Sequence, residues 1–285
     1  MQKLTSPKII EEILKRHGFK MSKKFGQNFL TDENIVSKIV NVAEVSEEDV
    51  VLEIGPGIGA MTAKLCERAK HVIAVEIDKM LIPILKETLA EYKNCTVINE
   101  DILKLDIGSE IKKYTHKKFK VVANLPYYIT TPIIMGLLEK DLPMESITVM
   151  IQKEVAERIA ATPGGKEYGA LTVACGYYTR PQLSFIVPSR VFVPRPKVDS
   201  AVIHMLVRED RLMDKDDKDR FFSVVKAGFA NRRKTLLNTL SNNLDYDKAE
   251  VKKALLLAGI EESKRAETLS FEDFKMLSEA FAKIK

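Results

Sequence analysis

The stretch Asp49-Val-Val-Leu-Glu-Ile-Gly55-Pro-Gly57-Ile-Gly59 decides the fold. Its first half is a short apolar run, which is typical of a strand buried on both faces of a sheet. The alternating glycines that follow permit a turn whose backbone approaches a ligand closely. Residues 60–69 then have helical character. This strand, turn and helix predict a nucleotide-like ligand at the turn; a purely structural turn is the alternative.

The spacing of the glycines narrows the choice of ligand. It is G-x-G-x-G, with glycine at 55, 57 and 59, whereas the dinucleotide fold that seats a pyrophosphate on a helix N-terminus prefers G-x-G-x-x-G. The spacing therefore favours S-adenosylmethionine as cofactor. A nicotinamide-dependent oxidoreductase is the disfavoured alternative.

Strand-like and helix-like segments continue to alternate after the glycine turn. Such alternation predicts a parallel, doubly wound α/β sheet of the Rossmann-like kind. The predicted strands are residues 71–77, 96–99, 120–123 and 146–151, and the predicted helices are residues 80–92, 132–139 and 153–160. Two further apolar strands, 183–187 and 198–207, are expected to close the sheet as an antiparallel pair. Ser6-Pro7 predicts the start of a basic amphipathic helix near the N-terminus.

The last part of the chain has only helical periodicity. Residues 208–220 are almost wholly charged and are interpreted as a hinge. Residues 221–285 follow as helices, including 248–258 ended by Gly259. We therefore expect two domains, a cofactor-binding domain over residues 1–207 and a small all-helical domain over residues 208–285.

Composition excludes several classes of protein. The 285 residues are 45% hydrophobic and 30% charged, and no apolar run approaches the roughly 20 residues that span a bilayer. The first eight residues lead into Glu11 and Glu12 rather than an apolar segment, so we expect no secretory signal and a cytoplasmic location. Three scattered cysteines argue against a disulfide framework, and four dispersed histidines predict no metal site.

Positive charge is concentrated in a few places. The net charge is +5, and residues 1–30 carry seven basic side chains against two acidic ones. Further basic clusters lie at residues 112–120 and at Arg232-Arg233-Lys234. The clusters suggest a polyanionic partner, with solvated surface charge as the alternative for each.

Two acidic residues lie at or just after the ends of predicted strands, at positions where open α/β sheets bind ligands. Glu76 comes about 20 residues after the glycines, where a carboxylate accepts hydrogen bonds from ribose hydroxyls. Asp101 follows the next strand and is placed to accept a hydrogen bond from the adenine amine of the cofactor. An ordinary surface carboxylate is the alternative for either residue alone, and the correct order of three strand ends disfavours it.

Asn124-Leu125-Pro126-Tyr127, at the end of another predicted strand, is the most specific motif in the chain. An adenine amine is a poor nucleophile because its lone pair is delocalised into the ring. If the Asn124 side-chain oxygen and a backbone carbonyl near Pro126 accept its two protons, the lone pair is directed at the methyl donor. Positioning of this kind supplies about 7 to 11 kcal/mol in favourable cases. Tyr127 is then expected to stack on an unpaired or flipped-out base.

Taken together, these motifs resemble those of the small-subunit (16S) ribosomal RNA adenine dimethyltransferase family. The resemblance runs nearly end to end. It rests on residues 25–30 (Phe-Gly-Gln-Asn-Phe-Leu), 53–62, 124–130 (Asn-Leu-Pro-Tyr-Tyr-Ile-Thr), 192–200 (Phe-Val-Pro-Arg-Pro-Lys-Val-Asp-Ser) and 232–236 (Arg-Arg-Lys-Thr-Leu). Arg195 departs from the proline expected in many relatives, with little expected effect. The resemblance implies a class I methyltransferase sheet followed by a small helical domain.

The resemblance also implies roles for individual residues. It assigns Asn124 and Tyr127 to catalysis, within a motif that includes Leu125 and Pro126, and it places Phe192 against the opposite face of the target base. The residues implied for the cofactor are Asn28, Leu30, Gly55, Gly57, Glu76, Asp101 and Asn124. The implied reaction is dimethylation of two adjacent adenosines in a loop near the 3′ end of the small-subunit RNA, late in subunit assembly.

The expected partner is therefore 16S ribosomal RNA, either in the small subunit or in its precursor. A loop target agrees with chemistry, because A-form duplex hides its base edges while loop bases splay out. The candidates for phosphate contacts are Lys23, Lys24, Arg232, Arg233 and Lys234. Nothing in the sequence demands more than a monomer. The alternatives are a 23S ribosomal RNA adenine methyltransferase of the antibiotic-resistance type and a non-enzymatic assembly factor.

Overall fold

The computed structural model describes residues 3–21, 25–209 and 213–284. By its internal contacts the chain divides into two compact units. The first comprises residues 1–156 and 182–207, and the second comprises residues 157–181 and 208–285. The change of unit after Val207 lies where the sequence analysis placed its boundary. Residues 157–181, which were expected in the cofactor-binding domain, belong instead to the helical unit.

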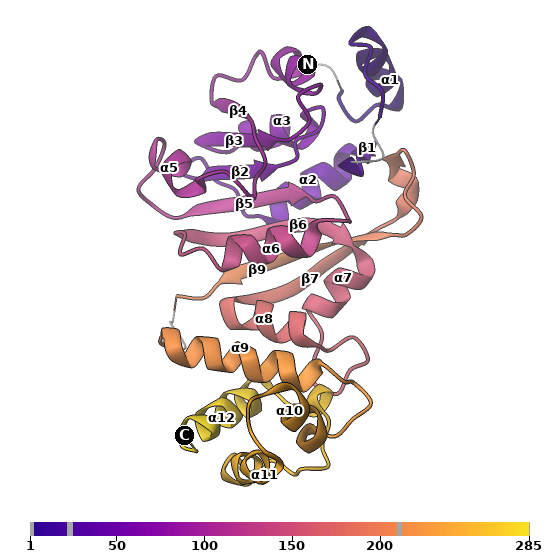
Figure 1. The fold of residues 1–285 in the computed structure, drawn as a ribbon. Coiled ribbons are helices and arrows are strands. Elements are labelled where there is room, and N and C mark those ends of the chain that lie inside the picture. The colour runs from indigo at the N-terminus through magenta and orange to yellow at the C-terminus, as the bar shows by residue number, and fades with distance from the viewer. Residues whose placement is uncertain (1–2, 22–24, 210–212, 285) are drawn as a thin grey trace. The chain divides into compact units, whose positions relative to one another are not determined.

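The first unit is built on a sheet that has seven strands in the described part of the chain, in the order β4-β3-β2-β5-β6-β9-β7. Figure 1 shows them following one another in this order from β4 to β9. Strands β4, β3, β2, β5 and β6 are parallel, and β9 pairs antiparallel with β6. The strands are β2 (Val50–Ile54), β3 (His71–Glu76), β4 (Cys95–Asn99), β5 (Phe119–Asn124), β6 (Met144–Gln152), β7 (Thr179–Val187) and β9 (Ser200–Val207).

The parallel strands form because their residues are apolar on both faces, as helices on each side require. All five residues of β2 are buried. One face of the sheet packs against α2 and α3 in a single apolar cluster that includes Val36, Leu65 and Val122. The helices of this unit are α1 (Pro7–Arg16), α2 (Glu33–Val42), α3 (Ala60–Cys66), α4 (Ile82–Thr88), α5 (Ile107–Lys112), α6 (Thr130–Leu138) and the start of α7 (Lys153–Ile159).

A separate two-stranded sheet joins the N-terminal part of the chain to a distant segment. Strand β1 (Phe29–Leu30) pairs antiparallel with β8 (Phe192–Val193), which follows the short helix η2 (Ser189–Val191). In the register Phe29 opposes Val193, and Leu30 opposes Phe192. Two of the motifs found in the sequence, 25–30 and 192–200, are therefore neighbours in space.

The second unit is helical and surrounds its own apolar core. Tyr177 of α8 brings residues 157–181 into this core, since its ring lies 5.7 Å from that of Phe221 and 5.1 Å from that of Phe222. The elements are α8 (Ala170–Tyr178), α9 (Lys215–Phe229), α10 (Leu236–Asn243), α11 (Lys248–Leu257), η3 (Ala266–Thr268) and α12 (Phe271–Ala282).

The hinge expected over residues 208–220 is shorter than the sequence analysis proposed. Helix α9 begins at Lys215, and the Asp214 side chain accepts a hydrogen bond from the Asp217 backbone amide (2.9 Å). Acidic side chains stabilise the first turn of a helix by meeting its unpaired amides and its positive end. The charge run that suggested a hinge therefore includes a helix N-terminus.

Candidate functional site

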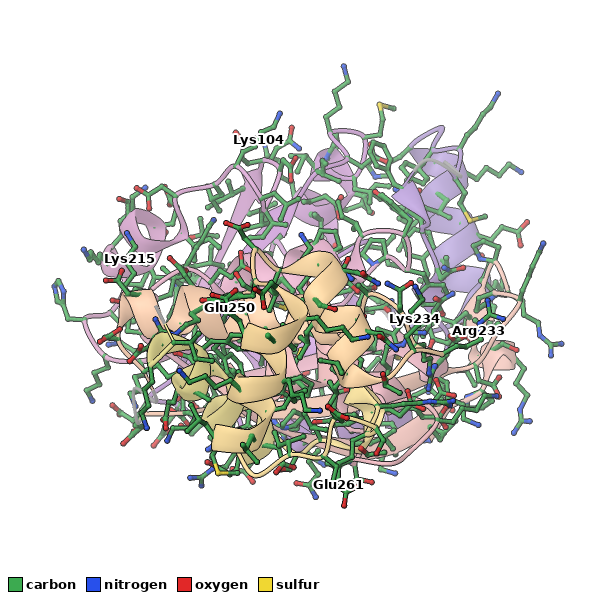
Figure 2. All side chains as sticks on the ribbon, turned by 60° about the horizontal axis from the view of Figure 1, so that its bottom comes forward. Lys104, Lys215, Arg233, Lys234, Glu250 and Glu261 are labelled. Atoms are coloured by element: carbon green, nitrogen blue, oxygen red, sulfur yellow. The ribbon has the colours of Figure 1, made fainter. Side chains whose placement is uncertain are left out.

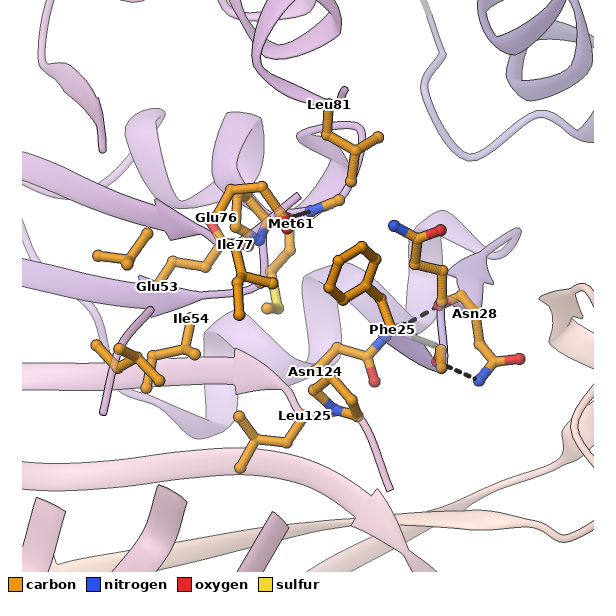
Figure 3. A pocket seen from close by; sticks show the side chains of 18 of the residues that line it. Phe25, Asn28, Glu53, Ile54, Met61, Glu76, Ile77, Leu81, Asn124 and Leu125 are labelled. Carbon is orange, nitrogen blue, oxygen red and sulfur yellow. Dashed lines mark hydrogen bonds between the residues drawn. The ribbon is translucent and has the colours of Figure 1, made fainter. Parts of the chain in front are cut away.

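The carboxyl ends of the parallel strands surround one pocket. Chain segments that leave β2, β3, β4 and β5 line it, together with residues 25–30. Figure 3 shows side chains from these segments facing the same space. The pocket brings together every residue that the sequence analysis assigned to the cofactor and four of the five assigned to catalysis, namely Asn28, Leu30, Gly55, Gly57, Glu76, Asp101, Asn124, Leu125, Pro126 and Tyr127.

The glycine turn is shaped for close approach of its backbone to a neighbour. Gly57 has a φ of 62°, in the left-handed region that favours glycine. A Cβ at this position would lie 3.1 Å from Cε1 of Phe29, which is tighter than an ordinary contact. The turn is therefore held against residues 25–30, and an alanine at position 57 would disturb both.

Glu76 is buried at the end of β3 and is already fixed by backbone donors. Its Oε1 accepts a hydrogen bond from the Asp78 amide (2.8 Å), and its Oε2 accepts one from the Gly57 amide (3.3 Å). Burial raises the pKa of Glu76 to about 7, although these two amides oppose the change by stabilising the carboxylate. A carboxylate beside the glycine turn fits the ribose of a nucleoside cofactor.

Asp78 does not line the pocket but supports residues that do, and the sequence analysis did not single it out. It is buried, and its Oδ2 accepts a hydrogen bond from Nε2 of Gln27 (2.7 Å). This contact ties residues 25–30 to the end of β3. The sequence could have indicated this role, because Asp78 lies two residues after Glu76 in Val-Glu-Ile-Asp and so stays at the same edge of the sheet.

Asp101 stands at the pocket edge, as its position after β4 suggested. Its Oδ1 accepts a hydrogen bond from the Leu103 amide (3.0 Å), which fixes the side chain in a turn at the end of the strand. The carboxylate is partly exposed and therefore accessible to the amine of an adenine.

Glu53 lies in the buried strand β2, where a carboxyl group is unexpected. It is 0% exposed, and among the described residues neither of its side-chain oxygens has a hydrogen-bond partner. Burial raises the pKa of Glu53 to about 8, so the group is neutral at pH 7. It lines the pocket from within the core, and its neutral form explains how β2 accommodates it.

Asn124 ends β5 with its side chain turned toward residues 25–30. Its Nδ2 donates a hydrogen bond to the main-chain oxygen of Asn28 (3.1 Å), drawn as a dashed line in Figure 3. The sequence analysis left open which backbone carbonyl near Pro126 is the second acceptor for the substrate; that of Pro126 itself accepts from the Thr130 hydroxyl (3.0 Å) and the Ile129 amide (3.2 Å). It is therefore engaged within the turn, whereas the Leu125 carbonyl has no such partner among the described residues.

The aromatic residues expected to hold the target base have different positions relative to the pocket. The Tyr127 hydroxyl shares a 2.7 Å hydrogen bond with Oγ of Ser200, so the last residue of the 192–200 motif anchors the ring. Phe192 does not line the pocket. Its side chain is 2% exposed and packs in the core cluster, so in this conformation it does not face a target base. The exposed ring at the pocket is Tyr128 (58%), which the sequence analysis did not single out.

The basic residues proposed for RNA have different surroundings. Lys23 and Lys24 lie outside the described residues. Arg232 contacts Glu267 (3.9 Å) and the Lys166 carbonyl, whereas Arg233 and Lys234 are exposed and have no ion partner within the described part of the chain. Figure 2 shows the side chains of these last two beside each other.

The basic cluster at residues 112–120 is largely neutralised. Lys120 is buried in β5, with Nζ 3.0 Å from Oδ2 of Asp49 and 2.7 Å from the Glu44 carbonyl. Two more of its lysines contact acids, in the pairs Lys113–Glu110 (2.6 Å) and Lys117–Glu48 (3.5 Å). Burial removes Lys120 from any polyanion-binding surface at this cluster, and for its exposed lysines that interpretation stays a prediction.

Within residues 3–21, 25–209 and 213–284, no three His, Cys, Asp or Glu side chains gather in an arrangement that could hold a metal ion. Over the same residues, no helix combines the length and the apolar character that crossing a bilayer requires.

Comparison with known proteins gives full-length matches. The family described as ribosomal RNA adenine dimethylase matches residues 18–283. The chain is 50% identical to the ribosomal RNA small subunit methyltransferase A of Alkaliphilus oremlandii, over 99% of both chains. It is also 50% identical to the Lactococcus lactis protein of the same name, over 96% of this chain and 95% of that one.

Solved structures agree with these matches. A dimethyladenosine transferase from Plasmodium falciparum superposes with a TM-score of 0.76 and 28% identity, over 90% of this chain and 98% of that one. The 23S rRNA methyltransferase ErmE superposes with a TM-score of 0.71 and 29% identity, over 89% of this chain and 99% of that one. The predicted α/β methyltransferase sheet with a C-terminal helical region is confirmed.

Proposed function

Because the chain belongs to the ribosomal RNA adenine dimethylase family, we propose that it dimethylates two adjacent adenosines in a loop near the 3′ end of small-subunit ribosomal RNA, late in subunit assembly. Membership makes it a methyltransferase that uses S-adenosyl-L-methionine. The observation that carries the proposal is the presence of Asn124 and the glycine turn in one pocket, in a chain half identical to small-subunit enzymes over its full length. Action in the cytoplasm and as a monomer stays a prediction.

The pocket suits this cofactor in its chemistry. The left-handed turn at Gly57 lets the glycine turn pack closely against Phe29, Glu76 suits the ribose hydroxyls, and Asp101 suits the adenine amine. Residues 25–30 add Asn28 and Leu30 to the lining of the pocket. When bound, S-adenosyl-L-methionine supplies a methyl group attached to a positively charged sulfur.

The chain's own part in the reaction is to orient the substrate amine. We assign the two acceptors for its protons to Oδ1 of Asn124 and to the Leu125 carbonyl, since the Pro126 carbonyl is engaged in its turn. Both are neutral, so they orient the lone pair without removing a proton. Tyr127, whose pKa burial raises above its usual value, stays neutral and offers a ring fixed by Ser200 for stacking.

A large-subunit methyltransferase of the antibiotic-resistance type is the second candidate, because ErmE shares the fold at 29% identity. The 50% identity to small-subunit enzymes over nearly the whole chain favours the first. The deciding experiment offers methyl-labelled S-adenosyl-L-methionine with under-methylated small subunits, large subunits and free RNA. Nucleoside mass spectrometry is expected to find dimethyladenosine in small-subunit RNA alone. Label in large-subunit RNA would support the second candidate, and binding without transfer would support an assembly factor.

Arg233 and Lys234 are proposed to hold RNA phosphates. Both are exposed and immediately precede the start of α10, so their charged ends are accessible to a polyanion. Changing both to glutamine is expected to weaken RNA binding and to flatten the slope of log affinity against log salt by about 1.4 to 1.8. The matched control changes Lys248 and Lys253, two exposed lysines of α11, to glutamine. An equal change of slope in the control would remove the assignment.

A further inference from the structure

The side chain of Asn124 has two ends of similar shape and opposite hydrogen-bonding character. Its Oδ1 only accepts hydrogen bonds, and its Nδ2 only donates them. A half-turn of the amide exchanges the two at little steric cost. In only one of the two orientations does Asn124 present an acceptor to a substrate amine. In the other, the N–H groups of the Asn124 side chain face the N–H groups of the amine and repel them.

The structure contains a group that selects between these orientations. The main-chain oxygen of Asn28 lies 3.1 Å from Nδ2 of Asn124. A carbonyl oxygen accepts hydrogen bonds and cannot donate them, so it stabilises the orientation in which Nδ2 faces it. Oδ1 is then turned away from Asn28 and is available to the substrate.

The Asn28 carbonyl is itself held from several sides. The Asn28 side chain closes its own turn by donating to the Gly26 carbonyl (3.0 Å), and Gln27 is tied to the buried Asp78 (2.7 Å). The next residue, Phe29, pairs with Val193 of β8, and its ring lies against Gly57. The Asn28 carbonyl can orient the Asn124 side chain only if its own position does not depend on Asn124. These contacts fix the position of residues 26–29 without Asn124.

We propose that the main-chain carbonyl of Asn28 is a positioning group for methyl transfer, which holds the amide of Asn124 with its oxygen toward the substrate amine. This inference rests on the proposed role of Asn124. It gives residues 25–30 a task beyond lining the cofactor pocket. Weakening this carbonyl should lower kcat and leave cofactor affinity unchanged.

The test exchanges the peptide bond between residues 28 and 29 for an ester, by placing the α-hydroxy acid counterpart of phenylalanine at position 29. An ester carbonyl is a weaker acceptor, and the change also removes the amide of residue 29 from the β1–β8 pairing. The matched control places the α-hydroxy counterpart of threonine at position 31. It removes the next amide that bonds across this part of the chain, the Thr31 amide that donates to the Val191 carbonyl of η2 (2.8 Å), and leaves the Asn28 carbonyl intact.

The ester at 29 is expected to lower kcat about 3- to 10-fold relative to the control, as the weakening of one neutral hydrogen bond implies. The dissociation constant of S-adenosyl-L-methionine should agree between the two within about twofold. By NMR, the Asn124 side-chain amide protons, identified by their absence in Asn124→Ala, should exchange with solvent faster only in the ester at 29. Equal kcat and equal exchange in both esters would overturn the inference.

A second pair of variants uses standard residues. Gly26 (φ 57°) and Gly18 (φ 60°) both have left-handed backbones, so alanine strains each alike. Gly26→Ala strains the turn that Asn28 closes, and its Cβ would also contact the Tyr128 ring (3.4 Å), while a Cβ at Gly18 meets nothing within 4 Å. Only Gly26→Ala should lower kcat, and the loss should be accompanied by faster exchange of the Asn124 side-chain amide protons, which contact with Tyr128 alone would not cause. If Asn124→Ala itself keeps normal turnover, the proposed role of Asn124 fails. If Asn124→Ala loses turnover but the two members of each pair have equal kcat and equal amide exchange, only the present inference fails.

Discussion

Asn124→Ala is expected to lower kcat by at least about 100-fold, a loss typical of removing one preorganised polar contact from an active site. The alanine has no oxygen to accept the amine proton, so the lone pair of the nitrogen is no longer directed at the methyl group. Cofactor affinity should change little, because Glu76, Asp101 and the glycine turn remain. Single-turnover methyl transfer and calorimetry with S-adenosyl-L-methionine measure the two quantities separately.

Asn94→Ala is the matched control for this change. The Asn94 side chain also donates to main-chain carbonyls, those of Cys66 and Ala69 (both 2.9 Å), but it does not line the pocket. It should lower stability and leave kcat per folded molecule unchanged. Near-normal turnover in Asn124→Ala, or an equal loss in Asn94→Ala, would refute the catalytic role of Asn124.

The sheet could be predicted because its signals are local. An apolar run such as Val50–Ile54 has to be covered on both faces, and the order of such runs along the chain determines the parallel topology. The pocket followed from the same reasoning. Parallel strands end at one edge, so the glycine turn after β2 and the polar residues at or just after the ends of β3, β4 and β5 had to meet there.

The features that local sequence patterns do not report depend on contacts between segments far apart in sequence. Lys120 belonged by spacing to a basic cluster, but the strand register buries it beside Asp49. Phe192 was expected against a base, yet the pairing of β8 with β1 places its ring in the core. Tyr177 joins the helical unit through rings some 45 residues later in the chain, and no local periodicity reports such a contact.

Glu76→Ala is expected to weaken S-adenosyl-L-methionine binding about 10- to 100-fold, since hydrogen bonds to a charged group contribute about 1.5 to 3 kcal/mol each. Calorimetry measures the change. The alanine also releases the Gly57 and Asp78 amides from Glu76, so Glu76→Gln serves as the comparison that keeps an acceptor in place. An unchanged dissociation constant in Glu76→Ala would remove Glu76 from the ribose site.

The pH dependence of S-adenosyl-L-methionine binding shows how much the charge of Glu76 contributes to affinity, apart from the shape of its side chain. Burial raises its pKa to about 7 in the free protein, so about half of the molecules carry a neutral acid there at pH 7. Ribose hydroxyls donate hydrogen bonds to the carboxylate, so binding favours the ionised form and lowers the pKa in the complex. Affinity should therefore be highest above pH 7 and fall as the pH drops below it, by at most about tenfold per unit. Glu76→Gln cannot titrate, so its affinity should stay constant between about pH 6 and about pH 8; a slope equal to that of the unaltered protein would assign the titration to another group.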